Sequence, residues 1–312
     1  MTHTALVTGV AGFVGSHLAE RLLADGWQVK GVDCFTDAYA RSIKERNLAA
    51  VGGHSRFRFE EADLVTVDLA EMVEGIDTVF HLAGQAGVRT SWGAEFEIYT
   101  KRNVLATQRL LEAVKGKGLG RFVYASSSSI YGDTEDLPVT EGSLPSPISP
   151  YGVSKLAAEH LCRLDHTAFG VPTVSVRYFT VYGPRQRPDM AFHRLIRAML
   201  GDEPFPLYGD GEQTRDFTFV QDAVAATVLA ANAEAGRVYN VGGGARVTLN
   251  AVIAMLEELM GKKARIERQT KQAGDVRHTW ADTSQFRDAV GFAPRVPLRE
   301  GLGREVAWLK GL

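Results

Sequence analysis

A short apolar run that turns through glycines directly into a helical pattern is the feature that most restricts the fold of this chain. Ala5–Thr8 is followed by Gly9-Val10-Ala11-Gly12-Phe13-Val14-Gly15 and then by the amphipathic stretch Val14–Ala24. This order is typical of the first unit of a parallel α/β sheet. Similar alternation continues to residue 180, with apolar runs at Gln28–Val32, Arg56–Phe59, Thr78–Leu82, Arg121–Ser126 and Thr173–Arg177, and helical stretches such as Glu97–Val114 and Ser154–Ala168. Such strands predict a Rossmann-type, doubly wound parallel sheet with helices on both faces.

The glycines suit a dinucleotide site. Gly9 permits the tight turn after the strand, Gly12 lets backbone approach a pyrophosphate, and Gly15 lets the helix pack closely against the sheet. The helix N-terminus then offers free N–H groups and its dipole to the phosphates. The second strand leads into Asp33, whose carboxylate would accept hydrogen bonds from ribose hydroxyls and repel a 2′-phosphate. We therefore predict NAD rather than NADP as the cofactor, with Asp63 after the third strand near the adenine.

A second motif, Tyr151-Gly152-Val153-Ser154-Lys155, indicates proton chemistry beside that cofactor. Tyr151 and Lys155 are four residues apart, so on a helix they share one face. A phenol titrates near pH 10, and a neighbouring ammonium stabilises its phenolate at neutral pH. The serine run at residues 126–129 would add a hydroxyl that bridges the phenol and a substrate alcohol. Together these residues predict a nicotinamide-dependent enzyme that oxidises an alcohol, with Lys155 also holding the nicotinamide ribose.

Composition excludes several other classes. The net charge is −2 and no run of five like charges occurs, so general electrostatics favours neither a nucleic-acid nor a membrane-surface partner. Cys34 and Cys162 form no CxxC motif and the histidines show no metal-ligand spacing, so we expect neither a disulfide framework nor a metal site. His81 is interpreted as a packing residue. Without a long apolar segment or a basic leader, the sequence predicts a cytoplasmic protein without membrane spans.

Beyond residue 180, glycine and proline become frequent and the apolar runs shorten. Helical patterns recur at Ala223–Ala233 and Thr248–Met260. We expect a smaller C-terminal α/β domain that binds substrate. The predicted division assigns residues 1–180, and about 215–238 on a returning segment, to the NAD-binding domain, and residues 181–214 and 239–312 to the substrate domain.

The chain resembles the extended short-chain dehydrogenase/reductase family, and within it the nucleotide-sugar epimerases and dehydratases. The resemblance runs from Ala5 to about Leu302 through TGVAGFVG, HLAG, the Asn103 helix, SSSSIYG, YGVSK, RYFTVYGP, RDFTFV, NVGGG and GDVRHTWAD. It implies bound NAD, and it identifies Ser127, four residues before Tyr131, as the catalytic hydroxyl beside Tyr151 and Lys155. The cofactor residues expected beyond Gly9, Gly12, Gly15, Asp33 and Asp63 are Phe13, Val14, Leu64, Leu82, Ala83, Lys155 and Tyr178.

Within this family the chain looks most similar to enzymes that epimerise UDP-glucuronic acid at C4. Sugar 4,6-dehydratases have Asp-Glu where this chain has Ser128-Ser129, which disfavours dehydration. UDP-glucose 4-epimerases and UDP-glucuronate decarboxylases place Asn where this chain has Thr180; both activities remain alternatives, with a non-catalytic NAD-binding sensor as a remote one. Arg185-Gln186 stand where the similar subgroup has Trp-Gly. The expected substrate contacts are Arg89, Ser128, Ser129, Thr180, Arg185, Arg187, Arg215 and Asp275.

The chemistry of a uronic acid explains why this site would need such residues. Oxidation at C4 makes a β-keto acid, which loses CO₂ when its carboxylate bond aligns with the carbonyl π system. Hydroxyls of Ser128, Ser129 and Thr180, with the Arg187 guanidinium, would hold the carboxylate out of that alignment. The resemblance places Arg215 and Asp275 near the pyrophosphate and the uridine ribose. It also suggests a homodimer built on the helices Glu97–Val114 and Ser154–Ala168.

Overall fold

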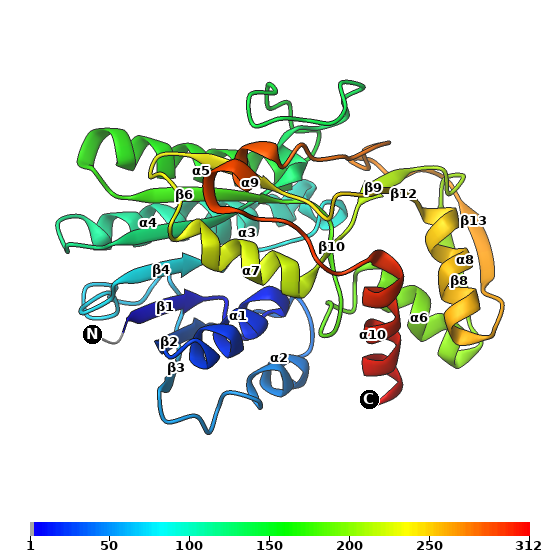
Figure 1. Cartoon of the computed structure of the whole chain (residues 1–312), viewed down its shortest axis with the longest axis horizontal. Helices are drawn as coiled ribbons and strands as arrows, with labels where there is room; N and C mark the ends of the chain where they lie inside the picture. Colours follow the sequence, from blue (N-terminus) through cyan, green and yellow to red (C-terminus); the bar gives the residue numbers. More distant parts are fainter. Residues whose placement is uncertain (1–2) are drawn as a thin grey trace.

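The computed structural model describes residues 3–312, and its centre is one sheet of seven parallel strands (Figure 1). The strand order is β11-β6-β5-β4-β1-β2-β3, so the chain starts in the interior of the sheet and winds outward in both directions. This arrangement confirms the predicted doubly wound fold. The strands are β1 Thr4–Thr8, β2 Gln28–Asp33, β3 Phe57–Glu61, β4 Thr78–His81, β5 Arg121–Ser127, β6 Thr173–Tyr178 and β11 Val238–Val241.

Two layers of helices cover the sheet (Figure 1). On one face α1 (Phe13–Ala24) packs against α7 (Val220–Ala230), and α2 (Arg41–Leu48) lies beside α1. On the other face α4 (Ala106–Val114) packs against α5 (Pro150–Phe169). Separate apolar cores form on the two faces, because each helix buries one stripe of side chains against strands that are apolar on both sides.

The predicted helix Glu97–Val114 is interrupted. It consists of α3 (Phe96–Tyr99), a π-helical segment Thr100–Leu105, and α4. Asn103 lies in the π-helical segment, where its amide holds both backbone groups of Gln85 and donates to the Ser154 hydroxyl at 2.8 Å. Single π-helical turns occur frequently at functional sites. This one joins the loop after β4 to α5.

The remaining elements form a smaller unit, shown on the right of Figure 1. Three two-stranded sheets pair β7 with β10, β9 with β12, and β8 with β13. This unit has its own apolar core, to which α6, α8 and α10 contribute. The elements of this unit are β7 Val181–Tyr182, α6 Ala191–Gly201, β8 Pro204–Tyr208, β9 Thr214–Asp216, β10 Thr218–Phe219, β12 Arg246–Thr248, α8 Leu249–Met260, β13 Arg265–Gln269 and α10 Leu298–Lys310. Outside it lie α9 Ser284–Val290 and the short 3₁₀ turns Arg89–Ser91, Gly93–Glu95 and Ser128–Ile130.

The boundary expected at residues 238/239 falls within β11, which is an outer strand of the large sheet. Helix α9 packs on β11, and the Tyr239 and Phe286 rings have centroids 4.9 Å apart. We therefore propose that β11 and α9 belong to the NAD-binding body and that the substrate domain takes the rest of the 239–312 segment. No helix within residues 3–312 is both long and apolar enough to cross a bilayer.

Candidate active site

The glycine turn after β1 has the close packing that its sequence predicts. Gly9 has φ +70°, a backbone conformation that favours glycine, and a Cβ on Gly15 would lie 2.2 Å from the Gly9 carbonyl oxygen. Gly12 is the N-cap of α1 and makes no side-chain capping bond. The backbone N–H groups of the first turn therefore have no side chain covering them, as a phosphate-binding helix start requires.

This turn forms one wall of a pocket at the carboxyl ends of β1, β2 and β4. Most of the predicted cofactor residues line it together: Gly9, Gly12, Phe13, Val14, Gly15, Asp33, Asp63, Leu64, Leu82 and Ala83. A pocket with a glycine cradle at a helix start and an acid at the end of the second strand fits a dinucleotide. Tyr178 is placed elsewhere, because its side chain packs in the core beside α7 and its hydroxyl bonds that of Thr227.

Two cations in the cofactor pocket were missed by sequence reasoning. The Lys44 ammonium is 3.6 Å from an oxygen of Asp33 and donates to the Thr36 carbonyl. Asp33 also accepts from the backbone N–H of Ala11 at 3.1 Å. In addition Arg102 pairs with Asp63 at 3.1 Å. Neither Lys44 nor Arg102 lies in a recognisable motif; both reach the pocket from helical segments that pack over it.

Ser127 and Tyr151 come together where β5 ends and α5 begins. Helix α5 starts at Pro150, four residues earlier than the helical pattern indicated, because Ser149 caps it by accepting from the Gly152 N–H at 3.1 Å. Gly152 is required there, since a Cβ would lie 2.6 Å from the Ser129 carbonyl oxygen. This contact brings the first turn of α5 against the end of β5, and the Ser127 hydroxyl comes close enough to the Tyr151 phenol to lower its pKa.

Burial dominates the electrostatics of this pair and of Lys155. The pKa of Tyr151 is raised by burial, while the nearby Ser127 hydroxyl and the Arg187 charge act to lower it. The Lys155 ammonium lies 4.4 Å from the centre of the Tyr124 ring. Burial lowers its pKa to about 8, although the nearby Cys162 and Glu159 act to raise it. The two pKa values therefore move apart, since burial disfavours the charged form of each group: that of Tyr151 rises while that of Lys155 falls.

His81 lies beneath this centre as a packing residue. Its two ring nitrogens contact the hydroxyls of Thr8 and Thr107 at 2.7 and 2.9 Å. Burial, with the Lys155 charge, lowers its pKa to about 3, so the ring is neutral at pH 7. No group of three or more His, Cys, Asp or Glu side chains in the described part of the chain has the geometry of a metal site.

A second pocket collects several of the predicted substrate residues at the interface with the smaller unit. Ser128, Ser129, Thr180, Arg215 and Asp275 line it together. The hydroxyls come from the end of β5 and from the turn after β6, and the two charged residues come from β9 and the segment that follows β13. The pocket thus joins hydroxyls that directly follow Ser127 in the chain to charged groups that suit a nucleotide.

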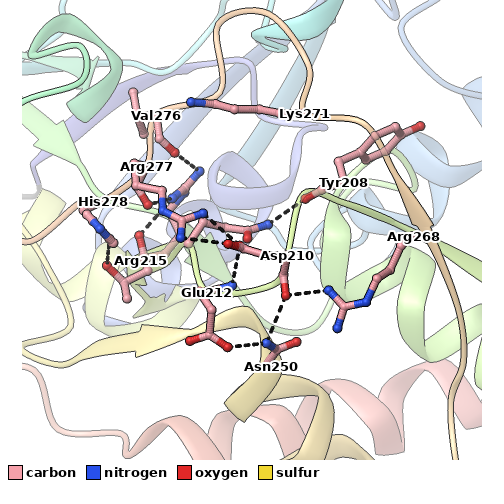
Figure 2. Close-up of polar contacts among 12 residues, drawn as sticks. Tyr208, Asp210, Glu212, Arg215, Asn250, Arg268, Lys271, Val276, Arg277 and His278 are labelled. Atoms are coloured by element: carbon pink, nitrogen blue, oxygen red, sulfur yellow. Dashed lines mark hydrogen bonds and ion pairs between the residues drawn. The ribbon is translucent and has the colours of Figure 1, made fainter.

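Arg215 forms no ion pair with the neighbouring Asp216 or with Asp275, so its charge is not neutralised by either carboxylate. It donates to the carbonyls of Thr214 and Val276, both at 2.8 Å, and the neighbouring Arg277 holds Asp210 through two hydrogen bonds at 2.8 and 2.9 Å (Figure 2). This network fixes segment 276–278 above β9. Arg215 is only half-exposed and retains a positive charge facing the pocket.

Arg89 does not line this pocket itself, but it pairs at 2.7 Å with Asp275, which does. The Arg89 guanidinium also lies 4.2 Å from the centre of the Tyr208 ring. A phosphate could replace Asp275 as the partner of Arg89, and a ribose hydroxyl could replace Arg89 as the partner of Asp275. The pair therefore marks a place where a nucleotide can bind.

Arg185 and Arg187 point in different directions. Arg187 lines the cofactor pocket and pairs with Asp189 at 2.9 Å, and its charge acts to lower the pKa of the Tyr151 phenol. Burial works to lower the pKa of Arg187, but Asp189 and the nearby Tyr151 raise it overall. Arg185 instead turns back onto α1, where it pairs with Glu20 at 2.5 Å. The structure thus brings Arg187, and not Arg185, to the reaction centre.

Comparisons with known proteins agree with this architecture. Residues 5–242 match the model of the NAD dependent epimerase/dehydratase family. The chain is 45% identical over 310 residues to the uncharacterized UDP-glucose epimerase YtcB of Bacillus subtilis (strain 168), covering 98% of each protein. It is 38% identical over 314 residues to UDP-glucuronate 4-epimerase of Thermodesulfobacterium geofontis (strain OPF15), covering 98% of this chain and 95% of the relative. A crystal structure of UDP-glucuronic acid 4-epimerase from Bacillus cereus, in complex with UDP-glucuronic acid and NAD, superposes with a TM-score of 0.97 at 44% identity, covering 99% of both chains.

Proposed function

Because this chain belongs to the NAD dependent epimerase/dehydratase family, we propose that it epimerises UDP-glucuronic acid at C4 to give UDP-galacturonic acid. The observation that carries the proposal is the pocket in which Ser128, Ser129 and Thr180 present hydroxyls beside Ser127. The likeness to UDP-glucuronic acid 4-epimerases over the whole chain supports it. One relative bears the name of a UDP-glucose epimerase, so UDP-glucose is the second candidate substrate.

NAD is the cofactor, and the pocket at the ends of β1 and β2 would hold it. The first turn of α1, from Gly12 to Gly15, would bind the pyrophosphate through backbone N–H groups, and Asp33 the adenosine ribose. Lys155 would hold the nicotinamide ribose. The chemistry that NAD supplies when bound is reversible hydride transfer at C4 of the sugar.

Tyr151 is the proposed base. Its phenol lies near the Ser127 hydroxyl, which acts to lower its pKa, so a substrate 4-hydroxyl placed beside them can pass its proton to the phenolate directly or through the serine. Lys155, four residues along α5, would stabilise the phenolate by its charge. The same phenol returns the proton when the ketone is reduced, so Tyr151 and Ser127 end each cycle as they began it.

The uronate carboxylate would lie against hydroxyls and a guanidinium. Ser128, Ser129 and Thr180 can donate to it, and Arg187 approaches the Tyr151 phenol from the cofactor side. Held in this way, the carboxylate stays out of line with the C4 carbonyl and CO₂ is retained. A dehydratase needs an acid and a base at positions 128 and 129, and two serines cannot supply them.

Arg215 and Asp275 are proposed to hold the nucleotide end of the substrate, with Arg89 on the pyrophosphate. Substrate binding would then separate Arg89 from Asp275, because the phosphate would pair with Arg89 and the ribose hydroxyls with Asp275. With the pyrophosphate anchored, the 4-keto sugar can rotate and present its other face to Tyr151.

We further propose that the protein acts as a homodimer in the cytoplasm. Support for the dimer is a set of exposed apolar side chains on α3, on the π-helical segment after it and on α5, comprising Phe96, Ile98, Leu105, Val153, Leu164 and Phe169. Such side chains gathered on adjacent helices suit a helix-to-helix interface. Both cysteines are free thiols, as a reducing compartment would keep them.

Incubation of the purified protein with UDP-glucuronic acid and no added NAD, followed by proton NMR, tests the proposal. We expect UDP-galacturonic acid to accumulate to a near-balanced mixture. A UDP-pentose with release of CO₂ would make the protein a decarboxylase and refute the role of Thr180. No conversion of UDP-glucuronic acid, with conversion of UDP-glucose to UDP-galactose, would select the second candidate.

A further inference from the structure

The chain segment that carries Arg187 begins with an unusual tight turn. The Gln186 N–H donates to the Gly183 carbonyl at 3.0 Å, which closes a four-residue turn with Pro184 at its second position. Arg185 occupies the third position with φ +67°. A turn with proline second and a positive φ third normally has glycine there, because a side chain is strained in that conformation. Something must therefore hold Arg185 in place.

Contacts with α1 provide that restraint. The Arg185 guanidinium pairs with Glu20 at 2.5 Å and donates to the Ser16 hydroxyl at 3.3 Å. The ring of His17 donates from Nε2 to the Pro184 carbonyl at 2.9 Å, since a carbonyl can only accept. These three α1 residues follow directly on the Gly12–Gly15 turn and lie on consecutive turns of the same helix. The turn is thus fastened to the helix that begins at the cofactor pocket.

The smaller unit holds the turn from the other side. Glu305 of α10 accepts from the Gly183 N–H at 2.9 Å. The side-chain oxygen of the buried Gln186 accepts from the His193 backbone N–H at 3.0 Å. The backbone carbonyl of Gln186 contacts Nδ1 of the His193 ring at 2.8 Å. Residues 183–186 are therefore fixed by α1, α6 and α10. Arg187 follows at once and reaches the cofactor pocket near Tyr151.

We propose that Arg185 is a positioning residue: by binding Glu20 and Ser16 it sets the turn so that Arg187 meets the uronate carboxylate and keeps CO₂ from leaving. This inference rests on the proposed function and deepens it. Arg185 itself does not contact the reaction centre, since its guanidinium is directed to α1. Its side chain acts through the backbone of the turn, and the strained φ is the mark of that constraint.

Arg185→Gly separates this role from simple turn stability. Glycine suits a positive φ, so the variant relieves the strain while it removes the guanidinium. Glu20→Gln removes the partner charge and leaves the turn untouched. Arg21→Gln, which breaks an exposed pair with Asp25 on the same helix, is the matched control. Each protein is given UDP-glucuronic acid, and UDP-galacturonic acid and UDP-pentose are measured by NMR, alongside kcat, KM and thermal unfolding.

The proposal predicts that Arg185→Gly and Glu20→Gln both form more UDP-pentose than the wild type. Their kcat for epimerisation should fall by about tenfold or more at nearly constant KM, because misplacement by about 1 Å can cost up to about 10²-fold. Arg185→Lys should recover part of the loss, and Arg21→Gln should behave as the wild type. Wild-type product ratios and kcat in both Arg185→Gly and Glu20→Gln would overturn the inference. A wild-type protein inactive on UDP-glucuronic acid would instead overturn the proposed function.

Discussion

Replacing Lys155 with methionine should abolish epimerisation and yet stabilise the nucleotide-free protein at neutral pH. Lys155 is buried in α5 with its ammonium over the Tyr124 ring. Burial lowers its pKa from 10.5 to about 8. At about 1.36 kcal/mol per pKa unit, this difference corresponds to a cost of about 3 kcal/mol for holding the charged form in the folded protein. Methionine has a similar length and no charge.

The pH dependence of the unfolding free energy tests whether the buried Lys155 charge causes this difference in stability. Between pH 8 and 10.5 the unfolded chain keeps the lysine proton more firmly than the folded protein, so the unfolding free energy of the wild type should rise with pH by about 3 kcal/mol. That stability is present above the unfolded pKa and lost as pH falls through the folded pKa. Lys155→Met lacks this contribution, so its advantage of about 3 kcal/mol at pH 7 should shrink above pH 8.

Urea unfolding of nucleotide-free protein at pH 7, 8.5 and 10, followed by circular dichroism, measures the difference. Lys310→Met, at an exposed position near the end of α10, is the control and should change neither stability nor its pH dependence appreciably. If Lys155→Met were less stable than the wild type at pH 7, the charged Lys155 would not destabilise the folded protein. A difference in unfolding free energy that stayed constant with pH would lead to the same conclusion.

Three further perturbations follow from the structure. Gly15→Ala places a Cβ 2.2 Å from the Gly9 carbonyl oxygen, so the purified protein should lose its retained NAD, seen as a lower ratio of absorbance at 260 to 280 nm. Arg177→Met leaves the buried Glu159 carboxylate without its partner and should lower the unfolding free energy by about 3–5 kcal/mol in urea titrations. Asp33→Ser removes the acid at the end of β2 and leaves the Lys44 ammonium in place, so the ratio of NADP to NAD affinity should rise by an order of magnitude or more in competition binding.

Much of the large sheet could be predicted from the sequence because inner strands such as β1, β4 and β6 are buried on both faces. A run that is apolar at every position, followed by a helical period, has few other interpretations. Strands of two or three residues in the smaller unit, such as β7 and β10, lack any such pattern. They form because tertiary packing brings their backbones together, so sequence periodicity could not place them. The start of α5 was missed because its first turn reads as a proline-glycine loop until Ser149 is recognised as a cap.

The residues of the candidate site likewise fall into those that sequence motifs predict and those that they do not. Residues close in sequence to a strand end, such as Ser127 and Asp33, lie where the motif predicts, since the strand fixes their position. Lys44 and Arg102 were missed because they reach the cofactor pocket from helices, at distances in sequence that no short motif spans. The directions of Arg185 and Arg187 depend on the positive φ of Arg185 itself, and an arginine in a sequence gives no sign of that conformation.

The most direct test of C4 epimerisation follows a label on the reacting carbon. UDP-glucuronic acid carrying deuterium at C4 is converted in ordinary water without added cofactor, and the product is examined by proton NMR and mass spectrometry. If the same hydride leaves and returns, UDP-galacturonic acid will form with its deuterium still at C4. Product with hydrogen at C4, or a UDP-pentose in place of a uronic acid, would contradict an epimerase that uses retained NAD and keeps its substrate's carboxylate.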